Sequence, residues 1–253
     1  MKIRLDKLLV ERGHAASRER AQALILAGRV LVAEQRVDKA GTSVSEDSVI
    51  RLLGDDLRYV SRGGVKLESA LKHWAIQPAG RACVDVGTST GGFTDCLLQH
   101  GAASVLCIDT GYGQIAEKFR TDPRVSLMER TNARLLKPDS LSGRGISLIV
   151  MDVSFISATL VLPAVLDALG STEQSWSGDL VLLVKPQFEA GREHVGKGGI
   201  VREPAARQLA IDRVLAMVDE LKGALPEIID SPIRGMEGNH EYLLRSCWPR
   251  TKA

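Results

Sequence analysis

The sequence predicts a doubly wound α/β sheet over residues 61–253, preceded by a smaller α+β domain over residues 1–60. Three observations predict this fold class. Strand-like apolar runs alternate with helical patterns after residue 61, a glycine-rich turn follows the first of those strands, and the first 60 residues show neither feature. Such alternation is typical of a mostly parallel sheet that has helices on both faces and binds ligands at the carboxyl ends of its strands.

Composition and charge limit the class of protein. With 253 residues, 44% of them apolar, the chain can bury a full core in one or two domains. Its net charge of +2 gives no global sign of a nucleic-acid partner. No apolar run approaches the roughly 18 residues of a membrane span, and no signal sequence opens the chain. We therefore expect a cytoplasmic protein with no membrane partner, whose sequence leaves the oligomeric state open and is compatible with a monomer.

The cysteines and histidines predict no metal site. Cysteine pairs with the spacing of zinc ligands are absent, and the five histidines are scattered. We expect buried thiols, as in a reducing compartment, at all four cysteines: Cys83, Cys96, Cys107 and Cys247.

The first domain combines two helices with short strands. Apolar spacing predicts a helix within residues 1–12, and Ser17 can cap a second helix over residues 18–26. Strand-like segments follow at 29–32, 36–37 and 48–52. The helices and the turn after them carry cations at Arg4, Lys7, Arg12, Arg18, Arg20 and Arg29. A solvated helix face explains such residues equally simply, so charge alone does not establish RNA binding.

The second domain shows the strand and helix alternation, and residues 59–64 are expected to link it to the first. Strand-like runs lie near residues 82–86, 104–108, 125–128, 146–151, 180–185, 227–230 and 241–246. Helical patterns lie near residues 64–73, 93–100, 112–120, 156–169 and 204–222.

Residues 82–98 contain the most informative motif. A strand runs into Gly87-Thr88-Ser89-Thr90-Gly91-Gly92, and a helix follows. Glycine lets the backbone approach a ligand, and the free amides of a helix N-terminus attract polar groups. Ser89 replaces the second glycine of the dinucleotide fingerprint, and Asp85 would repel a pyrophosphate. S-adenosylmethionine has no phosphate and carries an ammonium and a sulfonium, so the turn favours this cofactor over NAD.

Asp109 ends the next strand, about 20 residues beyond the turn, where an acidic residue accepts hydrogen bonds from ribose hydroxyls. Asp85 or Asp109 alone is explained equally well as a cap of a strand or helix. Both together at this spacing favour a cofactor site.

Four further polar residues fall where such a fold has its active site. Lys66 follows a glycine turn, Asp152 and Lys185 each end an apolar strand, and Glu241 begins one. Simpler explanations are a surface lysine, a helix cap, a strand-end charge and a turn acid. Lys185 is the most informative, because a charge directly after five apolar residues must emerge into a cleft or be paired.

The first domain resembles the αL-type RNA-binding domain of a ribosomal protein, tyrosyl-tRNA synthetases and pseudouridine synthases. The resemblance lies in residues 4–9, 17–25 and 28–32. Folded RNA is recognised largely through shape and phosphates. The resemblance implies RNA contacts from Arg4, Lys7, Arg18, Arg20 and Arg29.

The second domain resembles the FtsJ-like ribose 2′-O-methyltransferases through the ordered set Lys66, Asp152, Lys185 and Glu241. Taken with the αL-type domain, the motifs at residues 60–67, 85–87, 151–157, 184–189 and 238–242 resemble the TlyA family. These bacterial rRNA 2′-O-methyltransferases are often labelled haemolysins. The resemblance implies a Rossmann-like methyltransferase sheet, S-adenosylmethionine as cofactor, and transfer of methyl to ribose, expected to be that of cytidine, in rRNA within ribosomal subunits.

The same resemblance implies roles for individual residues. Lys185 is the expected base, its neutral amine favoured by burial and by the nearby Lys66, with Asp152 and Glu241 orienting the lysines. The methionine end of the cofactor is assigned to Asp85, Gly87, Ser89, Gly91 and Gly92, its ribose to Asp109 and its adenine to Asn132. A plain turn asparagine explains Asn132 equally well. Further RNA contacts are expected from Arg62, Arg192, Lys197 and Arg202.

Four alternatives are weighed against this interpretation. A non-catalytic RNA-binding or ribosome-assembly factor would keep the fold without turnover. A membrane-active haemolysin would need an amphipathic or spanning helix, for which the sequence offers no pattern. Base methylation would need an Asn/Asp-Pro-Pro-aromatic loop or a nucleophilic cysteine, and residues 152–155 provide neither. The near-match of residues 191–197 to a phosphate loop is rejected because Gly198 stands at its Ser/Thr position.

Overall fold

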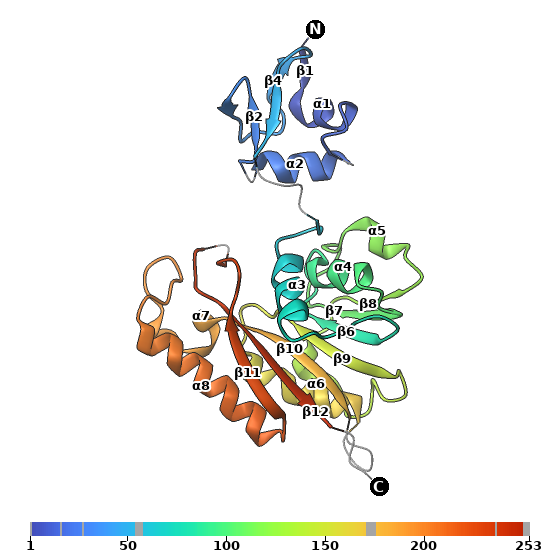
Figure 1. Ribbon diagram of the computed structural model, residues 1–253, viewed down its shortest axis with the longest axis vertical. Coiled ribbons are helices and arrows are strands. Elements are labelled where there is room, and N and C mark those ends of the chain that lie inside the picture. Colours follow the sequence, from blue (N-terminus) through green and yellow to red (C-terminus); the bar gives the residue numbers. More distant parts are fainter. Residues whose placement is uncertain are drawn as a thin grey trace. The chain divides into compact units, whose positions relative to one another are not determined.

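The computed structural model describes residues 2–15, 17–26, 28–53, 58–170, 176–235 and 237–249. The chain forms two compact units, Met1–Arg58 and Tyr59–Ala253 (Figure 1). Among the described residues, no helix has the length and apolar character needed to cross a membrane.

The first unit packs two helices against two small sheets. Helices α1 (Leu5–Glu11) and α2 (Arg18–Leu26) cover a core that includes Leu5, Leu9, Ile25 and Val30. The strands are β1 (Lys2–Arg4), which pairs antiparallel with β4 (Ser43–Ser45), and β2 (Val30–Val32), which pairs antiparallel with β3 (Gln35–Arg36) and β5 (Ile50–Leu52).

The predicted helix within residues 1–12 begins later than its apolar stripe indicates. Residues 2–4 are extended, and the helix starts only at Leu5, whose amide donates to the carbonyl of Thr42. Pairing of β1 with β4, a strand that the sequence does not predict, holds this segment extended. The partner strand lies about 40 residues away, so no local periodicity reports it.

A seven-stranded sheet forms the centre of the second unit, with the order β11-β12-β10-β9-β6-β7-β8. Neighbours from β10 to β8 pair in parallel, whereas β12 is antiparallel to both β10 and β11. The strands are β6 (Ala82–Val86), β7 (Ser104–Ile108), β8 (Val125–Met128), β9 (Ile146–Met151), β10 (Gly178–Val184), β11 (Ala224–Asp230) and β12 (Tyr242–Trp248). This doubly wound sheet confirms the predicted fold class.

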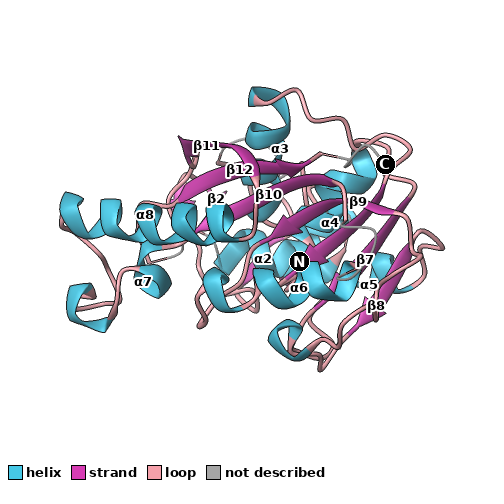
Figure 2. Ribbon diagram, turned by 90° about the horizontal axis from the view of Figure 1, so that it is seen from below, coloured by secondary structure: helices cyan, strands magenta, loops and turns pink. Residues whose placement is uncertain are grey.

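Helices cover both faces of the sheet, as Figures 1 and 2 show. One face packs on α3 (Gly63–His73), α4 (Gly92–Gln99) and α5 (Glu117–Arg120), the other on α6 (Leu162–Leu169) and α8 (Pro204–Glu220). Alternate residues of one strand serve the two cores: Leu182 and Val184 of β10 face α6, and Val181 and Leu183 face α3 and α4. Burial on both faces explains why β10 is a continuous apolar run.

Two predicted helices are shorter than expected. Residues 112–116 are irregular, and only the four residues of α5 are helical. Within residues 156–169, a 3-10 turn at Ala158–Leu160 precedes α6. Pro163 near the start of α6 lacks the amide that a continuous helix would need, which explains the break.

The expected linker at residues 59–64 is wrong, because this segment packs into the second unit. Tyr59 is 1% exposed, and a Cβ atom at Gly64 would lie 2.2 Å from the Tyr59 ring. Gly64 therefore allows close packing of α3 against Tyr59.

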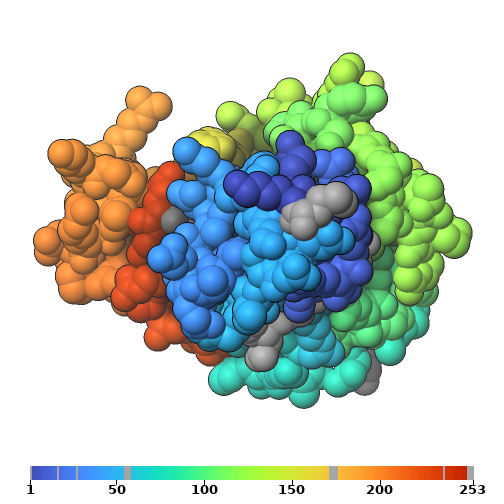
Figure 3. Space-filling view, turned by 90° about the horizontal axis from the view of Figure 1, so that it is seen from above, coloured from blue at the N-terminus to red at the C-terminus, as the bar shows by residue number. Residues whose placement is uncertain are grey.

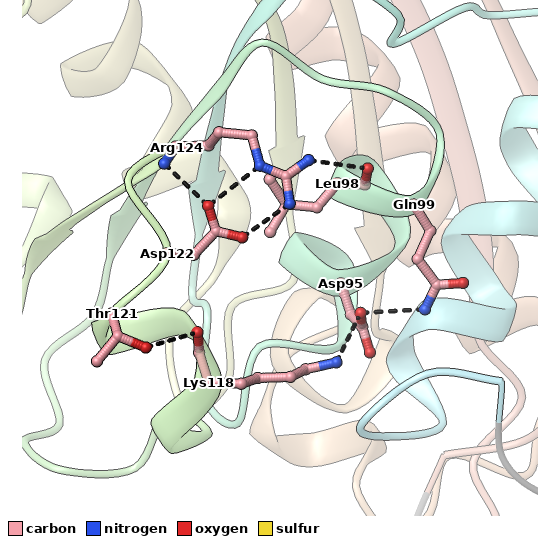
Figure 4. A network of polar contacts seen from close by, with 7 residues as sticks. All are labelled: Asp95, Leu98, Gln99, Lys118, Thr121, Asp122 and Arg124. Carbon is pink, nitrogen blue, oxygen red and sulfur yellow. Dashed lines mark hydrogen bonds and ion pairs between the residues drawn. The ribbon is translucent and has the colours of Figure 1, made fainter.

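A polar network joins this segment to α4 and α5. The carboxylate of Asp95 on α4, nearly fully buried, accepts hydrogen bonds from the Val60 amide at 2.8 Å, from Gln99 at 3.1 Å and from Lys118 at 3.0 Å. Figure 4 shows the Gln99 and Lys118 contacts, with Arg124 held nearby by Asp122. These contacts fix the N-terminal half of α4, which follows the glycine turn.

Candidate active site

Strand register brings the predicted site residues to one edge of the sheet. Val86 pairs with Ile108 and with Met151, so Gly87, Asp109 and Asp152 leave neighbouring strands at the same level. Val184 pairs with Tyr242, so the adjoining Lys185 and Glu241 also leave the sheet side by side.

The glycine turn approaches the chain closely at Gly87. This residue has φ of +85°, and a Cβ atom there would lie 2.5 Å from the carbonyl oxygen of Asp152. Gly91, with φ of +95°, would place a Cβ atom 2.7 Å from the ring of Phe119. Both positions therefore require glycine, since an L side chain would be strained and would clash.

Asp85 lies at the end of β6 and is fully buried. Its Oδ2 accepts a hydrogen bond of 2.6 Å from the Thr94 hydroxyl, whereas its Oδ1 has no donor among the described residues. Burial, with a smaller effect from the Asp152 charge, raises the pKa of Asp85 to about 7. A buried carboxylate oxygen without a donor is costly in free energy unless a ligand supplies one.

Asp109 binds two backbone amides of the surrounding loops. Its Oδ2 accepts from the Ser89 amide and its Oδ1 from the Gly111 amide, both at 2.7 Å. A pocket lies between these loops, lined by Thr88, Ser89, Cys107, Asp109, Gly111, Gln114, Ile115, Leu127 and Glu129. The turn and the end of β7 thus enclose one cavity, with Asp109 on its wall.

The two lysines form two separate ion pairs. Nζ of Lys66, on α3, lies 2.5 Å from Oε2 of Glu241, and Nζ of Lys185 lies 2.6 Å from Oδ1 of Asp152. Both lysines and Glu241 are buried, and Asp152 is half-buried. The set predicted from the sequence therefore divides into one pair that joins α3 to the start of β12 and one that joins the ends of β9 and β10.

Sequence reasoning missed Ser154, which is the second partner of Lys185. The Lys185 ammonium donates to Ser154 Oγ at 2.6 Å. The next residue, Phe155, is 94% exposed, has φ of +64°, and packs at a ring distance of 5.5 Å against Phe188. Spacing alone gives a serine two residues after an aspartate no special significance.

Two further buried side chains hold the loops around the site. Glu189 accepts hydrogen bonds from the Ser157 hydroxyl and the Ala158 amide, and burial raises its pKa. It thereby ties the segment after β9 to the short helix α7 (Pro186–Glu189). Asn239 accepts from the Val201 amide and donates to the Gly199 carbonyl, which ties the segment between α7 and α8 to the segment that carries Glu241.

Asn132 acts as a helix cap in this structure. Its Oδ1 accepts from the Arg134 amide at 3.1 Å at the start of the 3-10 helix Ala133–Leu135. The expected contact with adenine stays a prediction.

The cations predicted to bind RNA divide between the two units. In the first, Arg4 and Arg18 are half-exposed and paired with buried Asp6, and Lys7 lies 3.5 Å from Glu11. Arg20 is half-buried on α2, and Arg29 donates to the Leu53 carbonyl.

The second unit carries the other four. Arg62 donates to the Arg234 carbonyl at 2.7 Å. Arg192, Lys197 and Arg202 are exposed on the segment between α7 and α8. This part of the chain, orange in Figure 3, forms a lobe at the side of the second unit.

Comparison with known proteins decides the family. A family model for FtsJ-like methyltransferases matches residues 59–246, and one for the S4 domain matches residues 3–50. The chain is 45% identical over 250 residues to the 16S/23S rRNA (cytidine-2′-O)-methyltransferase TlyA of Mycobacterium tuberculosis, covering 98% of this chain and 90% of that protein. The chain belongs to the TlyA family of FtsJ-like methyltransferases.

Other relatives agree with this membership. Hemolysin A of Brachyspira hyodysenteriae is 39% identical over 95% of this chain and 98% of its own length. A solved structure that bears the name "Putative hemolysin from Streptococcus thermophilus" has a TM-score of 0.74 at 40% identity, covering 97% of this chain and 88% of that one. An S-adenosylmethionine-dependent methyltransferase from Mesorhizobium loti shares only the fold, with a TM-score of 0.51 at 13% identity over 72% of this chain and 98% of that one.

Membership in the family confirms that the protein is a methyltransferase with S-adenosylmethionine as its cofactor. The residues present fit that molecule. Asp85 Oδ1 can accept a hydrogen bond from an ammonium group. Because Gly87 has no side chain, only backbone atoms line the turn where it approaches Asp152. The first unit is an S4 domain, which confirms the predicted RNA-binding module.

Proposed function

We propose that this protein methylates the ribose 2′-hydroxyl of cytidine in bacterial rRNA, with assembled ribosomal subunits as substrate. The observation that carries the proposal is the pair of Lys185 and Asp152, held at the carboxyl edge of the sheet beside the glycine turn. Relatives named as 16S/23S rRNA (cytidine-2′-O)-methyltransferases support rRNA as the substrate.

Lys185 is the proposed base. A ribose hydroxyl is a weak nucleophile, and its proton must leave as the new O–C bond forms. The Lys185 amine receives that proton, and Asp152, 2.6 Å away, stabilises the ammonium that results. Lys66, held by Glu241, places a second positive charge where the hydroxyl oxygen gains negative charge.

S-adenosylmethionine, when bound, supplies a methyl group on a sulfonium, which makes the leaving group neutral. We assign its methionine end to Asp85, Gly87, Ser89, Gly91 and Gly92, its ribose to Asp109 and its adenine to Asn132. Held by these residues, the cofactor would present its methyl group to the hydroxyl, and in well-oriented systems such orientation is worth about 7–11 kcal/mol of the barrier.

We further propose that residues 1–60 bind rRNA through Arg4, Lys7, Arg18, Arg20 and Arg29, and that residues 61–253 carry out the transfer. Arg62, Arg192, Lys197 and Arg202 contact the RNA backbone near the site. Because ribosomal subunits are its proposed substrate, we also propose that the protein is cytoplasmic, and its oligomeric state stays open.

Labelled methyl transfer to unmethylated ribosomal subunits tests the proposal. Lys185→Ala is expected to lower the rate at least about 100-fold, as loss of a general base does, while cofactor affinity stays within threefold. The matched control is Lys197→Ala, which removes an exposed lysine of the same unit and is expected to weaken RNA binding only modestly. Turnover retained by Lys185→Ala would remove this lysine from the mechanism, and no transfer by the wild type would favour an assembly factor.

A further inference from the structure

Lys185 has two oxygen partners, and only one of them belongs to the predicted site. Asp152 Oδ1 and Ser154 Oγ each lie 2.6 Å from Nζ, while the lysine side chain itself is buried. Ser154 is exposed. The residue that accepts this hydrogen bond from the buried lysine therefore lies at the protein surface.

The segment that carries Ser154 is fixed at both ends. The Asp152 amide donates to the Val86 carbonyl at 2.9 Å, and the Ala158 amide donates to Glu189 at 2.7 Å. Between them, Phe155 takes the left-handed conformation with φ of +64°. Because a non-glycine residue adopts that conformation only under constraint from its surroundings, the position of the Ser154 hydroxyl is built into the loop.

A base that works repeatedly must lose its proton between turnovers. If Lys185 takes the ribose proton, it ends each turnover as an ammonium 2.6 Å from the Asp152 carboxylate. An ionised carboxylate only accepts hydrogen bonds, whereas a hydroxyl both accepts one and donates one. A carboxylate passes a proton on only by first becoming neutral, whereas a hydroxyl can accept one proton while it donates another, so Ser154 can relay a proton without changing its own charge.

We propose that Ser154 acts through Lys185 as a proton relay, which carries the proton from this lysine to solvent. The inference rests on the proposed role of Lys185 as base. An N–H bond of the Lys185 ammonium breaks as its proton moves to Ser154 Oγ, and the O–H bond of Ser154 breaks as its own proton moves to a water molecule. Serine is regenerated, the amine becomes neutral, and the net change is one proton released to water.

Comparing the first turnover with steady turnover tests this role, because an enzyme that is equilibrated with solvent beforehand does not wait for a proton from a preceding turnover to leave, whereas every later turnover does. With excess enzyme over ribosomal subunits, Ser154→Ala is expected to methylate within about twofold of the wild-type rate. With excess subunits, its steady rate is expected to fall at least about tenfold, the lower range of proton-transfer effects. Imidazole added as a diffusible proton acceptor is expected to restore the steady rate.

Two variants separate proton transfer from damage to the loop. Ser154→Thr keeps a hydroxyl and is expected to retain the wild-type steady rate. Ser142→Ala removes an exposed serine from a turn of the same unit and is expected to change neither rate. Cofactor binding by calorimetry checks that each variant is folded.

Two results would overturn the proposal. An equal loss of the first-turnover and steady rates in Ser154→Ala, without rescue by imidazole, would make the hydroxyl a structural contact. An unchanged steady rate would show that protons leave Lys185 by another route. Failure of the proposed function differs from both, since the wild type would then transfer no methyl group at all.

Discussion

The two units each bury an aspartate, and the two carboxylates have opposite surroundings. Asp6 in the first unit accepts hydrogen bonds from Arg4, Arg18 and Gln22, and the Arg4 guanidinium holds its pKa well below the usual range. Asp85 in the second unit has the Thr94 hydroxyl on one oxygen and no donor on the other among the described residues, and burial raises its pKa to about 7.

This difference distinguishes a buried aspartate that stabilises the fold from one that can bind a ligand. Burying a carboxylate is costly, and partners from the same chain offset the cost at Asp6. At Asp85 the chain leaves that cost partly uncompensated, at the edge of the sheet where ligands bind. A buried carboxylate that lacks a hydrogen-bond donor is therefore a better indication of a ligand-binding site than burial alone.

The largest expected effect is on stability as a function of pH. Because the folded pKa of Asp85 is raised, the folded state binds more protons than the unfolded state between about pH 4 and 7, and stability falls as pH rises through that window. A shift of this size is worth on the order of 4 kcal/mol. Without cofactor, the unfolding free energy of Asp85→Asn should exceed that of the wild type at pH 8 and converge with it near pH 4. Parallel stability curves for the two proteins would contradict the account.

The next effect is on cofactor affinity. Asp85→Asn should weaken binding of S-adenosylmethionine about 100-fold, because hydrogen bonds to charged groups contribute about 1.5–3 kcal/mol. Asp95→Asn is the matched control, since Asp95 is also buried but fully partnered by Val60, Gln99 and Lys118. Calorimetric titration should find its affinity changed less than threefold. Equal losses in the two variants would mean that Asp85 acts only through stability.

The smallest effect is on the first unit. Asp6→Asn should destabilise this unit by about 1–3 kcal/mol, since it weakens hydrogen bonds to charged groups at a buried position. The folded pKa of Asp6 is lowered, so its contribution is present above about pH 4 and is lost as pH falls. Hydrogen exchange should quicken in peptides from residues 5–26 and stay unchanged around Asp85. Uniform exchange changes across both units would show that the two aspartates are coupled.

The sequence predicts the fold well where burial of a strand or helix produces a recognisable pattern of apolar residues. Strands such as β10 are buried on both faces and end abruptly in a charge, so Lys185 and Asp152 could be placed at strand ends. The glycine turn was equally visible, because Gly87 and Gly91 are required by backbone geometry. These features are local and need no knowledge of distant partners.

Features that depend on distant partners could not be predicted. β1 is extended because it pairs with β4, and Tyr59 packs against Gly64 where the glycine pair suggested a linker. The Lys66–Glu241 pair joins α3 to the start of β12, and the contacts of Lys185 with Asp152 and Ser154 depend on the loop after β9. Sequence spacing assigns residues to an edge of the sheet but does not choose among partners there.

The most direct test is to identify the methylated nucleoside. Unmethylated ribosomal subunits would be incubated with the protein and labelled S-adenosylmethionine, and the RNA digested to nucleosides, with Lys185→Ala in parallel. The account predicts label in 2′-O-methylcytidine with the wild type only. Label in a methylated base would contradict it, because the fold and cofactor would stand while the proposed chemistry of Lys185 and Asp152 would not.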